Sequence, residues 1–116
     1  MSYEGNEEFW FRFMSLSELQ VHALRGHGVQ VEARPKRNAP GQFVASFRLS
    51  SDSTYDWLPS FVQSCKLTVS EYGIFISILT KHDSEIVTLP AFVLAVHHSV
   101  AGQIEFSFTV ISDSSE

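Results

Sequence analysis

The sequence predicts an α+β fold in which a mostly antiparallel sheet of about six strands packs against two to three helices. The segment Gln103–Ile111 alternates apolar and polar residues with the period of two that is typical of a half-buried strand. The opening segment Glu8–Met14 has a similar aromatic content. Segments that resemble hairpins dominate between these ends, and no repeated parallel crossover pattern is visible. We therefore expect the order β-α-β-β-α-β-β-α-β in a single domain spanning residues 1–116.

The first strand is predicted over about Glu7–Met14. Three phenylalanines share one face, while Trp10 and Met14 lie on the other, so we expect both faces to be at least partly covered. A helix then begins near Ser15–Gln20, because a serine stands at the cap position and Glu18 lies in the first turn. Its predicted apolar stripe consists of Leu16, Leu19, Ala23 and Leu24, and Gly26 and Gly28 end it.

A hairpin is predicted next. Val29–Pro35 alternates as a strand, residues 35–41 are rich in proline, glycine and asparagine as loops are, and Gln42–Ser50 is the returning strand. A short helix should start near Pro59, since proline fits only the first turn of a helix.

The segment from Leu67 to Leu79 is predicted to be a second hairpin, with Gly73 supplying the left-handed residue of a bulged turn. Because Ile74–Leu79 is almost continuously apolar, we expect a central strand that is covered on both faces. A short extended segment, Ile86–Thr88, and a third helix from about Thr88–Pro90 to Gly102 complete the order. On the last strand, Phe106 and Phe108 share the apolar face that should be buried.

The charge is unevenly distributed. The net charge is −5, yet the segment Arg25–Arg48 contains five basic residues and one acidic residue, so it carries +4 and the remainder carries −9. An acidic chain repels phosphates except at a small patch, which favours a basic protein partner over nucleic acid. The basic tip of the first hairpin, Arg34, Lys36 and Arg37, is either a solvated loop or a contact for phosphate or an acidic partner.

Nothing in the sequence indicates catalysis or a cofactor. The single Cys65 excludes an intramolecular disulfide, the polar start does not resemble a secretory signal, and no apolar run approaches the ~20 residues of a membrane span. We therefore expect a cytoplasmic protein without membrane attachment. The pairs His22 with His27 and His97 with His98 lack further ligands for a metal, and His82-Asp83 are adjacent residues, which rarely form a catalytic base with its orienting carboxylate.

The candidate partner-binding site is a set of acidic residues beside two aromatic residues. The acids lie mostly in predicted loops or at strand ends, where several of them could converge, and exposed aromatic side chains among acids are common in protein-binding surfaces. The predicted site residues are Asp52, Asp56, Trp57, Glu71, Tyr72, Asp83 and Glu85.

Two functional hypotheses follow. The first is a non-enzymatic protein-binding module. In size, acidity and cytosolic character the chain is similar to bacterial immunity and antitoxin proteins as a class, which implies inhibition of a basic, nuclease-like toxin by carboxylates that mimic phosphates. The alternative is a small enzyme or ligand-binding domain with a pocket between sheet and helices, where His22, His82 or His97 would converge. A homodimer through an edge strand is compatible with both hypotheses.

Overall fold

The structure is a computed structural model that describes residues 6–80 and 88–110. Strands and helices follow one another along the chain as β1 (Asn6–Ser17), α1 (Glu18–Arg25), β2 (Val31–Pro35), β3 (Gln42–Arg48), α2 (Leu58–Ser64), β4 (Tyr72–Thr80), α3 (Ala91–Val100) and β5 (Gln103–Val110). The predicted α+β class is thus confirmed, with three helices.

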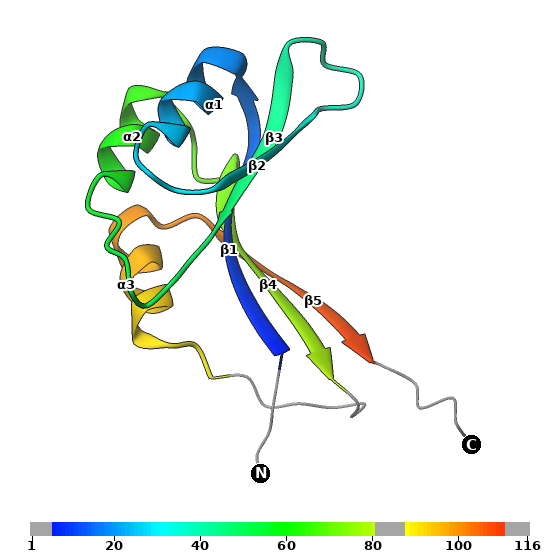
Figure 1. Cartoon of the computed structure of the whole chain (residues 1–116), viewed down its shortest axis with the longest axis vertical. Coiled ribbons are helices and arrows are strands. Elements are labelled where there is room, and N and C mark those ends of the chain that lie inside the picture. Colours follow the sequence, from blue (N-terminus) through cyan, green and yellow to red (C-terminus); the bar gives the residue numbers. More distant parts are fainter. Residues whose placement is uncertain (1–5, 81–87, 111–116) are drawn as a thin grey trace.

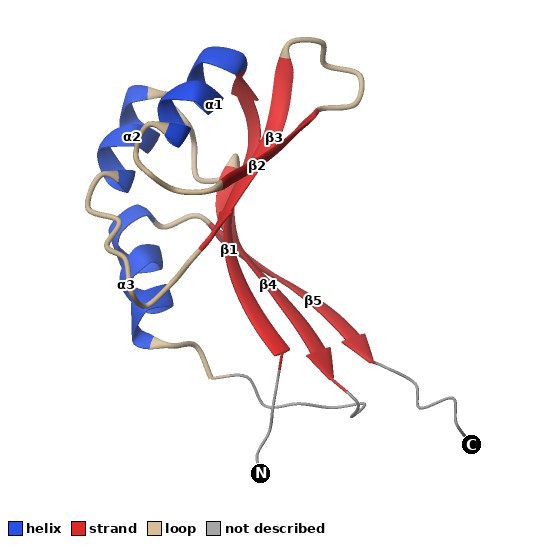
Figure 2. Ribbon diagram, viewed as in Figure 1, coloured by secondary structure: helices blue, strands red, loops and turns tan. Residues whose placement is uncertain are grey.

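The strands form one five-stranded sheet in the order β2-β3-β1-β4-β5. Neighbouring strands are antiparallel except for β4 and β5, which are parallel and connected through α3. The prediction of about six strands was therefore wrong, and the sheet is mixed. All three helices lie on the same side of the sheet (Figures 1 and 2), which leaves its other side without a helix in the described part of the chain.

The core lies between the sheet and the helices. Phe11 and Phe13 on β1 are fully buried there, and the ring of Phe11 stacks against Phe47 of β3 and Tyr72 of β4. These rings come from three adjacent strands, so β1 is the centre of the sheet in both position and packing. Aromatic burial of this kind is the largest apolar contribution that single side chains make to folding.

Helix α1 begins where the sequence indicates a cap. The Ser17 side chain accepts a hydrogen bond from the backbone N–H of Gln20, and the Gln20 side chain accepts one from Ser17 N–H, which completes a capping box. Val21 and Leu24 are the buried residues of this helix, whereas Leu19 is 81% exposed. The predicted stripe was therefore wrong at Leu19, which lies on the outer side of the helix.

Two other local predictions hold. The hairpin of β2 and β3 is antiparallel and pairs Val31 with Phe47, and α2 carries its proline in the first turn. Glycine also ends the α3 segment as expected, since Gly102 has a φ of 93°.

The second predicted hairpin does not form. Residues 67–70 lie in loop and turn conformation, and Gly73 does not have the positive φ that a bulged turn requires. Gly73 instead lies beside β5, where a Cβ atom would collide with the backbone carbonyl oxygen of Gln103. Glycine is needed here because two backbones approach closely, not because the chain turns. The expected segment Ile86–Thr88 lies almost wholly outside the described residues.

The expectation that β1 and β4 are covered on both faces was wrong. Phe75 and Ser77 of β4 alternate with buried isoleucines and therefore point to the side that carries no described helix. The apolar run of β4 arises because Phe75 faces a neighbouring side chain and not a second layer. None of the described helices has the length and apolar character needed to cross a membrane.

Candidate protein-binding surface

The side of the sheet opposite the helices, here called the open face, presents a mixed set of aromatic and charged side chains (Figure 2). It is defined by the residues that alternate with buried ones on each strand and that share rows in the strand registers. These residues are Glu8, Trp10, Arg12, Glu32, Arg34, Val44, Ser46, Arg48, Phe75, Ser77 and Glu105.

The centre of the open face is aromatic and cationic. Trp10 on β1 lies directly opposite Phe75 on β4 in the strand register. The guanidinium of Arg12 lies 4.0 Å from the centroid of the Phe75 ring and 3.7 Å from a carboxylate oxygen of Glu105. Arg12 therefore joins the central strand β1 to the edge strand β5 across β4, by a cation–π contact and an ion pair.

A second group of polar contacts involves Glu8. Its Oε1 atom accepts a hydrogen bond of 3.1 Å from the Trp10 indole N–H, and its Oε2 atom lies 3.9 Å from an Arg48 nitrogen. The indole is thereby oriented along the sheet surface while its ring remains half-exposed. An aromatic side chain held in one orientation before a partner arrives loses little conformational entropy on binding.

The open face is hollowed rather than flat. A depression of about 240 Å³ is lined by Trp10, Arg12, Phe75 and six further side chains of the face. Three arginines and three glutamates occupy the face, so its formal charge is zero although the chain carries −5. A neutral surface with an aromatic centre is suited to a protein partner of mixed charge, and it offers no net attraction to a polyanion.

The predicted site residues Asp52, Asp56 and Trp57 lie away from this face. Both aspartates are exposed in the loop that precedes α2. The Trp57 ring is half-buried on the helix side and stacks on His27, with 4.3 Å between the ring centroids and an interplanar angle of 6°. Trp57 therefore packs against the end of α1, and His27 is a packing residue in this structure.

Glu71 and Tyr72 are engaged within the fold. The Glu71 carboxylate accepts hydrogen bonds from the backbone N–H and the hydroxyl of Thr68, which closes a local turn. Tyr72 is buried and its hydroxyl donates to the Val100 carbonyl over 2.7 Å, so the exposed position expected for Tyr72 is not observed. Burial raises the pKa of the Tyr72 hydroxyl above its ordinary value.

The described acidic residues do not form one cluster. The loop that contains Asp52 leaves the sheet beside Phe9, whose carbonyl accepts from Leu49, while the Glu71 carbonyl accepts from Met14. Phe9 and Met14 are five residues apart on β1, or roughly 16 Å along a strand. Asp83 and Glu85 lie outside the described residues, as does His82.

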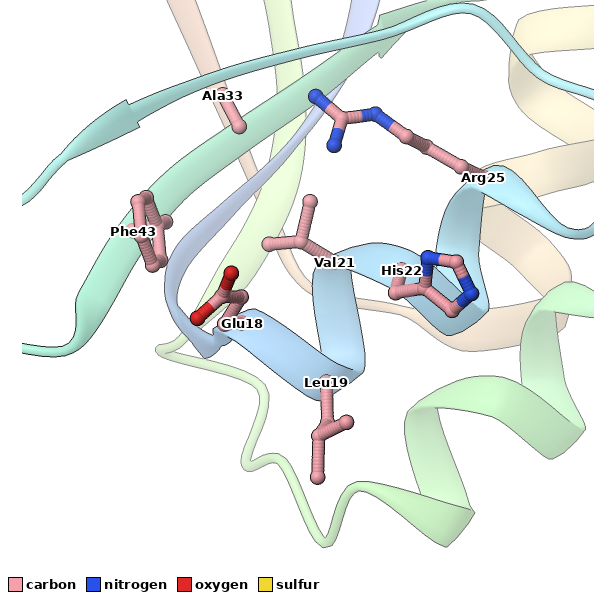
Figure 3. Close-up of a pocket in the computed structure, with 7 residues that line it drawn as sticks. All are labelled: Glu18, Leu19, Val21, His22, Arg25, Ala33 and Phe43. Atoms are coloured by element: carbon pink, nitrogen blue, oxygen red, sulfur yellow. The ribbon is translucent and has the colours of Figure 1, made fainter.

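The pocket required by the ligand-binding alternative exists between α1 and the β2–β3 hairpin (Figure 3). It has a volume of about 440 Å³ and an apolar floor of Val21, Ala33 and Phe43. Glu18 and Arg25 flank the floor at its two ends, and in Figure 3 both charged groups reach toward the hairpin. His22 lines the same pocket, but the two other histidines of the hypothesis do not.

Metal and thiol chemistry gain no support from the part of the chain that the structure describes. Within it, no three His, Cys, Asp or Glu side chains lie close enough together to hold a metal ion. The His97 Nε2 atom lies 3.2 Å from the Gly102 carbonyl oxygen at the end of α3. Burial raises the pKa of the half-buried Cys65 thiol, and a hydrogen bond with Ser64 opposes that shift only in part. A thiol with a raised pKa is a poor nucleophile at neutral pH.

Sequence reasoning missed the central residues Arg12, Phe75 and Glu105. The signal was present in β1, where Arg12 stands between Trp10 and Met14 on the face opposite the phenylalanines. A charged residue in the middle of a face argues against a covering layer, because burying an unpaired charge is costly. Comparisons with protein-family models, with curated proteins and with solved structures find no match to this chain.

Proposed function

We propose that the protein is a non-enzymatic protein-binding module that binds its partner through the open face. The observation that carries this proposal is the cluster of Trp10, Arg12 and Phe75 at the centre of a sheet face that no described helix covers. Tryptophan, tyrosine and arginine are the residue types that dominate binding energy in protein interfaces, and they do so near the interface centre.

The surroundings of the cluster have the composition of an interface rim. Glu8, Arg48 and Glu105 are partly exposed and pair with each other or with central residues at 3.7–3.9 Å. Exposed ion pairs of this kind contribute little to folding, so their role in stability is minor. On binding, the same charges can exchange partners with those of a second protein and fix its orientation.

The narrower proposal is an immunity- or antitoxin-type inhibitor of a basic, nuclease-like toxin. Its support is the net charge of −5, which would accelerate association with a basic partner. Because the open face itself is neutral, the attraction would come from acidic residues elsewhere, including Asp52, Asp56, Asp83 and Glu85. In this scheme the acidic residues set the association rate, and the open face holds the bound partner.

The experiment is affinity capture from the source cells with matched variants. The test variant is Arg12→Thr with Phe75→Thr, because threonine favours strands and the fold should persist. The control is Leu19→Ser, which removes an exposed apolar side chain on the helix side of the molecule. We expect proteins that the parent and the control retain to be lost by the test variant. Equal capture by all three folded proteins would contradict the proposal.

The inhibitor form has its own measurement. A captured partner should cleave nucleic acid when purified alone, and stoichiometric addition of the chain should abolish that cleavage. Reversal of Asp83 and Glu85 to lysine should slow association and reduce its dependence on salt while folding persists. A captured partner without activity on nucleic acid would reject the inhibitor form and leave the binding module.

The absence of chemistry is tested separately. We expect Cys65→Ser and His82→Ala to retain partner binding, and a chelator to leave the melting temperature unchanged, because a structural metal would contribute to folding free energy. A stoichiometric metal in protein purified without an affinity tag would instead favour the enzyme alternative. Loss of function in His82→Ala with an intact fold would do the same.

The pocket between α1 and the hairpin favours a small-ligand function as the second candidate. A ligand with an apolar body and opposite charges at its two ends would match Val21 and Phe43 on the floor and Glu18 and Arg25 at the ends. Amino acids and short peptides are the probes to add in an NMR titration. Shifts that gather around the floor residues would support this candidate, and their absence at millimolar ligand would reject it.

A further inference from the structure

The strand β5 has an outer edge that no described strand pairs with. It is eight residues long and lies at the end of the sheet, beside β4 only. The backbone N–H and C=O groups on that edge are therefore available to another strand. Figure 1 shows the edge at the outer side of the sheet, away from all three helices.

The opposite edge of the sheet has features that prevent such pairing, and β5 lacks them. β2 is only five residues long, ends in Pro35 and carries Glu32 and Arg34. Short length, proline and charge are common means of protecting an edge strand. β5 contains no proline and a single charged residue, Glu105, which is already paired with Arg12 of the same chain.

An exposed aromatic side chain accompanies the unprotected edge. Phe106 is 55% exposed, although its register partner Ile76 on β4 is fully buried. Both residues lie on the helix side of the sheet, so the helix layer covers β4 but not the neighbouring position on β5. Phe106 retains more than half of its surface for a contact that the described chain does not supply.

We propose that β5 is a dimerisation edge, at which a second copy of the chain adds its own β5 antiparallel and extends the sheet across both subunits. A two-fold axis perpendicular to the sheet generates such a pair and keeps the helix layers of the two copies on the same side. The Phe106 side chains of the two copies then lie on one face near the axis and cover each other. The open faces remain uncovered and lie side by side.

The charge pattern of β5 restricts the register. In a two-fold antiparallel pair, one residue lies opposite its own copy, and centring on Glu105 would place two carboxylates directly opposite each other. Centring on Phe106 sets Glu105 against Ser107 of the second copy, and centring on Ser107 sets it against Thr109. These two registers avoid like-charge contact and still bring the Phe106 side chains together as facing or diagonal neighbours.

The second copy is a better occupant than a foreign peptide because one surface supplies both sides of the contact. A strand with an aromatic residue and an internally paired charge is complementary to itself, which is the requirement for an isologous interface. The interface is small compared with the ~1,200–2,000 Å² of standard complexes, so we expect a dimer that dissociates on dilution.

Sedimentation of the full chain from about 1 µM to about 1 mM covers the range in which weak interfaces dissociate. The apparent mass should rise toward that of a dimer for the parent and for the control Leu19→Lys, and Phe106→Lys should remain monomeric. Circular dichroism verifies that both variants are folded. A parent that stays monomeric, or a Phe106→Lys variant that dimerises like the parent, would overturn the proposal.

Cysteine cross-linking reads the register in a Cys65→Ser background. Ser107→Cys alone should form a disulfide-linked dimer if the axis passes through residue 107, and Glu105→Cys with Ser107→Cys should do so if it passes through residue 106. The control is Glu32→Cys on the β2 edge, which should stay monomeric. Cross-linking of the control to the same extent as the β5 variants overturns the proposal. So does a monomer whose β5 edge instead binds an extended foreign peptide.

Discussion

The guanidinium of Arg12 lies over the ring of Phe75, 4.0 Å from its centroid. The two residues are diagonal neighbours, because the residue directly opposite Arg12 on β4 is Gly73. Since Gly73 has no side chain, Arg12 can lean across the vacant position onto Phe75 and reach Glu105 beyond it. The glycine therefore shapes the open face as well as the spacing of the strands.

The contact between Arg12 and Phe75 should be measurable as a coupling energy. In a double-mutant cycle with Arg12→Ala and Phe75→Ala, we expect the loss in unfolding free energy to be less than additive by about 0.5–1 kcal/mol, the range for exposed cation–π pairs. Urea unfolding of the four proteins provides the values. Additive losses would show that the two side chains are neighbours without a significant interaction.

Phenylalanines that look alike in the sequence should differ widely in their contribution to stability. Phe11 is fully buried on the central strand, and Phe11→Ala should cost about 3–5 kcal/mol. Phe106 is more than half exposed, so Phe106→Ala should cost well under half as much, in place of the full cost that burial of this face would imply. Chemical denaturation at low micromolar concentration, where any dimer has dissociated, compares them. Equal costs would place Phe106 in the core of the monomer.

The elements that depend on local sequence could be predicted, and those that depend on distant contacts could not. The β2–β3 hairpin and the start of α1 were predictable because alternation, a proline-rich turn and the Ser17 cap act over a few residues. The parallel pairing of β4 and β5 joins segments about thirty residues apart through a helix, and no local pattern specifies it.

The same distinction explains the errors at the candidate site. Gly73 after Glu71-Tyr72 looks like a turn in the sequence, but its cause is the approach of Gln103 from another strand. Tyr72 looks like an exposed aromatic residue because it follows an acid at a strand start, yet its hydroxyl bonds to Val100 in α3. Both residues are explained by partners that are about thirty positions away, which periodicity and composition do not show.

Tyr72 should make the protein sensitive to alkaline pH. Burial raises the pKa of its hydroxyl in the folded state, so its contribution to stability is complete below pH 10, near the ordinary value, and is lost as the pH rises through the raised pKa. Tyr72→Phe should cost about 1 kcal/mol at pH 7 through loss of the hydrogen bond to Val100. It should also weaken the decline in stability above pH 10. Melting temperatures across pH 7–11 test both effects, and parallel curves for parent and variant would contradict the assignment.

Gly73 should tolerate no side chain, although alanine is compatible with its backbone conformation. A Cβ atom at this position meets the carbonyl oxygen of Gln103, and because the obstacle is backbone it cannot rotate away. Relief requires β4 and β5 to separate at the start of β5, and we expect Gly73→Ala to lower the unfolding free energy by about 1–3 kcal/mol, as overpacking does. The matched control is Ser77→Ala on the same strand and the same face, where a β-carbon already exists and the change should cost little. Amide hydrogen exchange should show faster exchange at the start of β5 in Gly73→Ala and not in the control. If both variants match the parent in stability and exchange, the close approach of Gln103 to Gly73 is not a constraint on the fold.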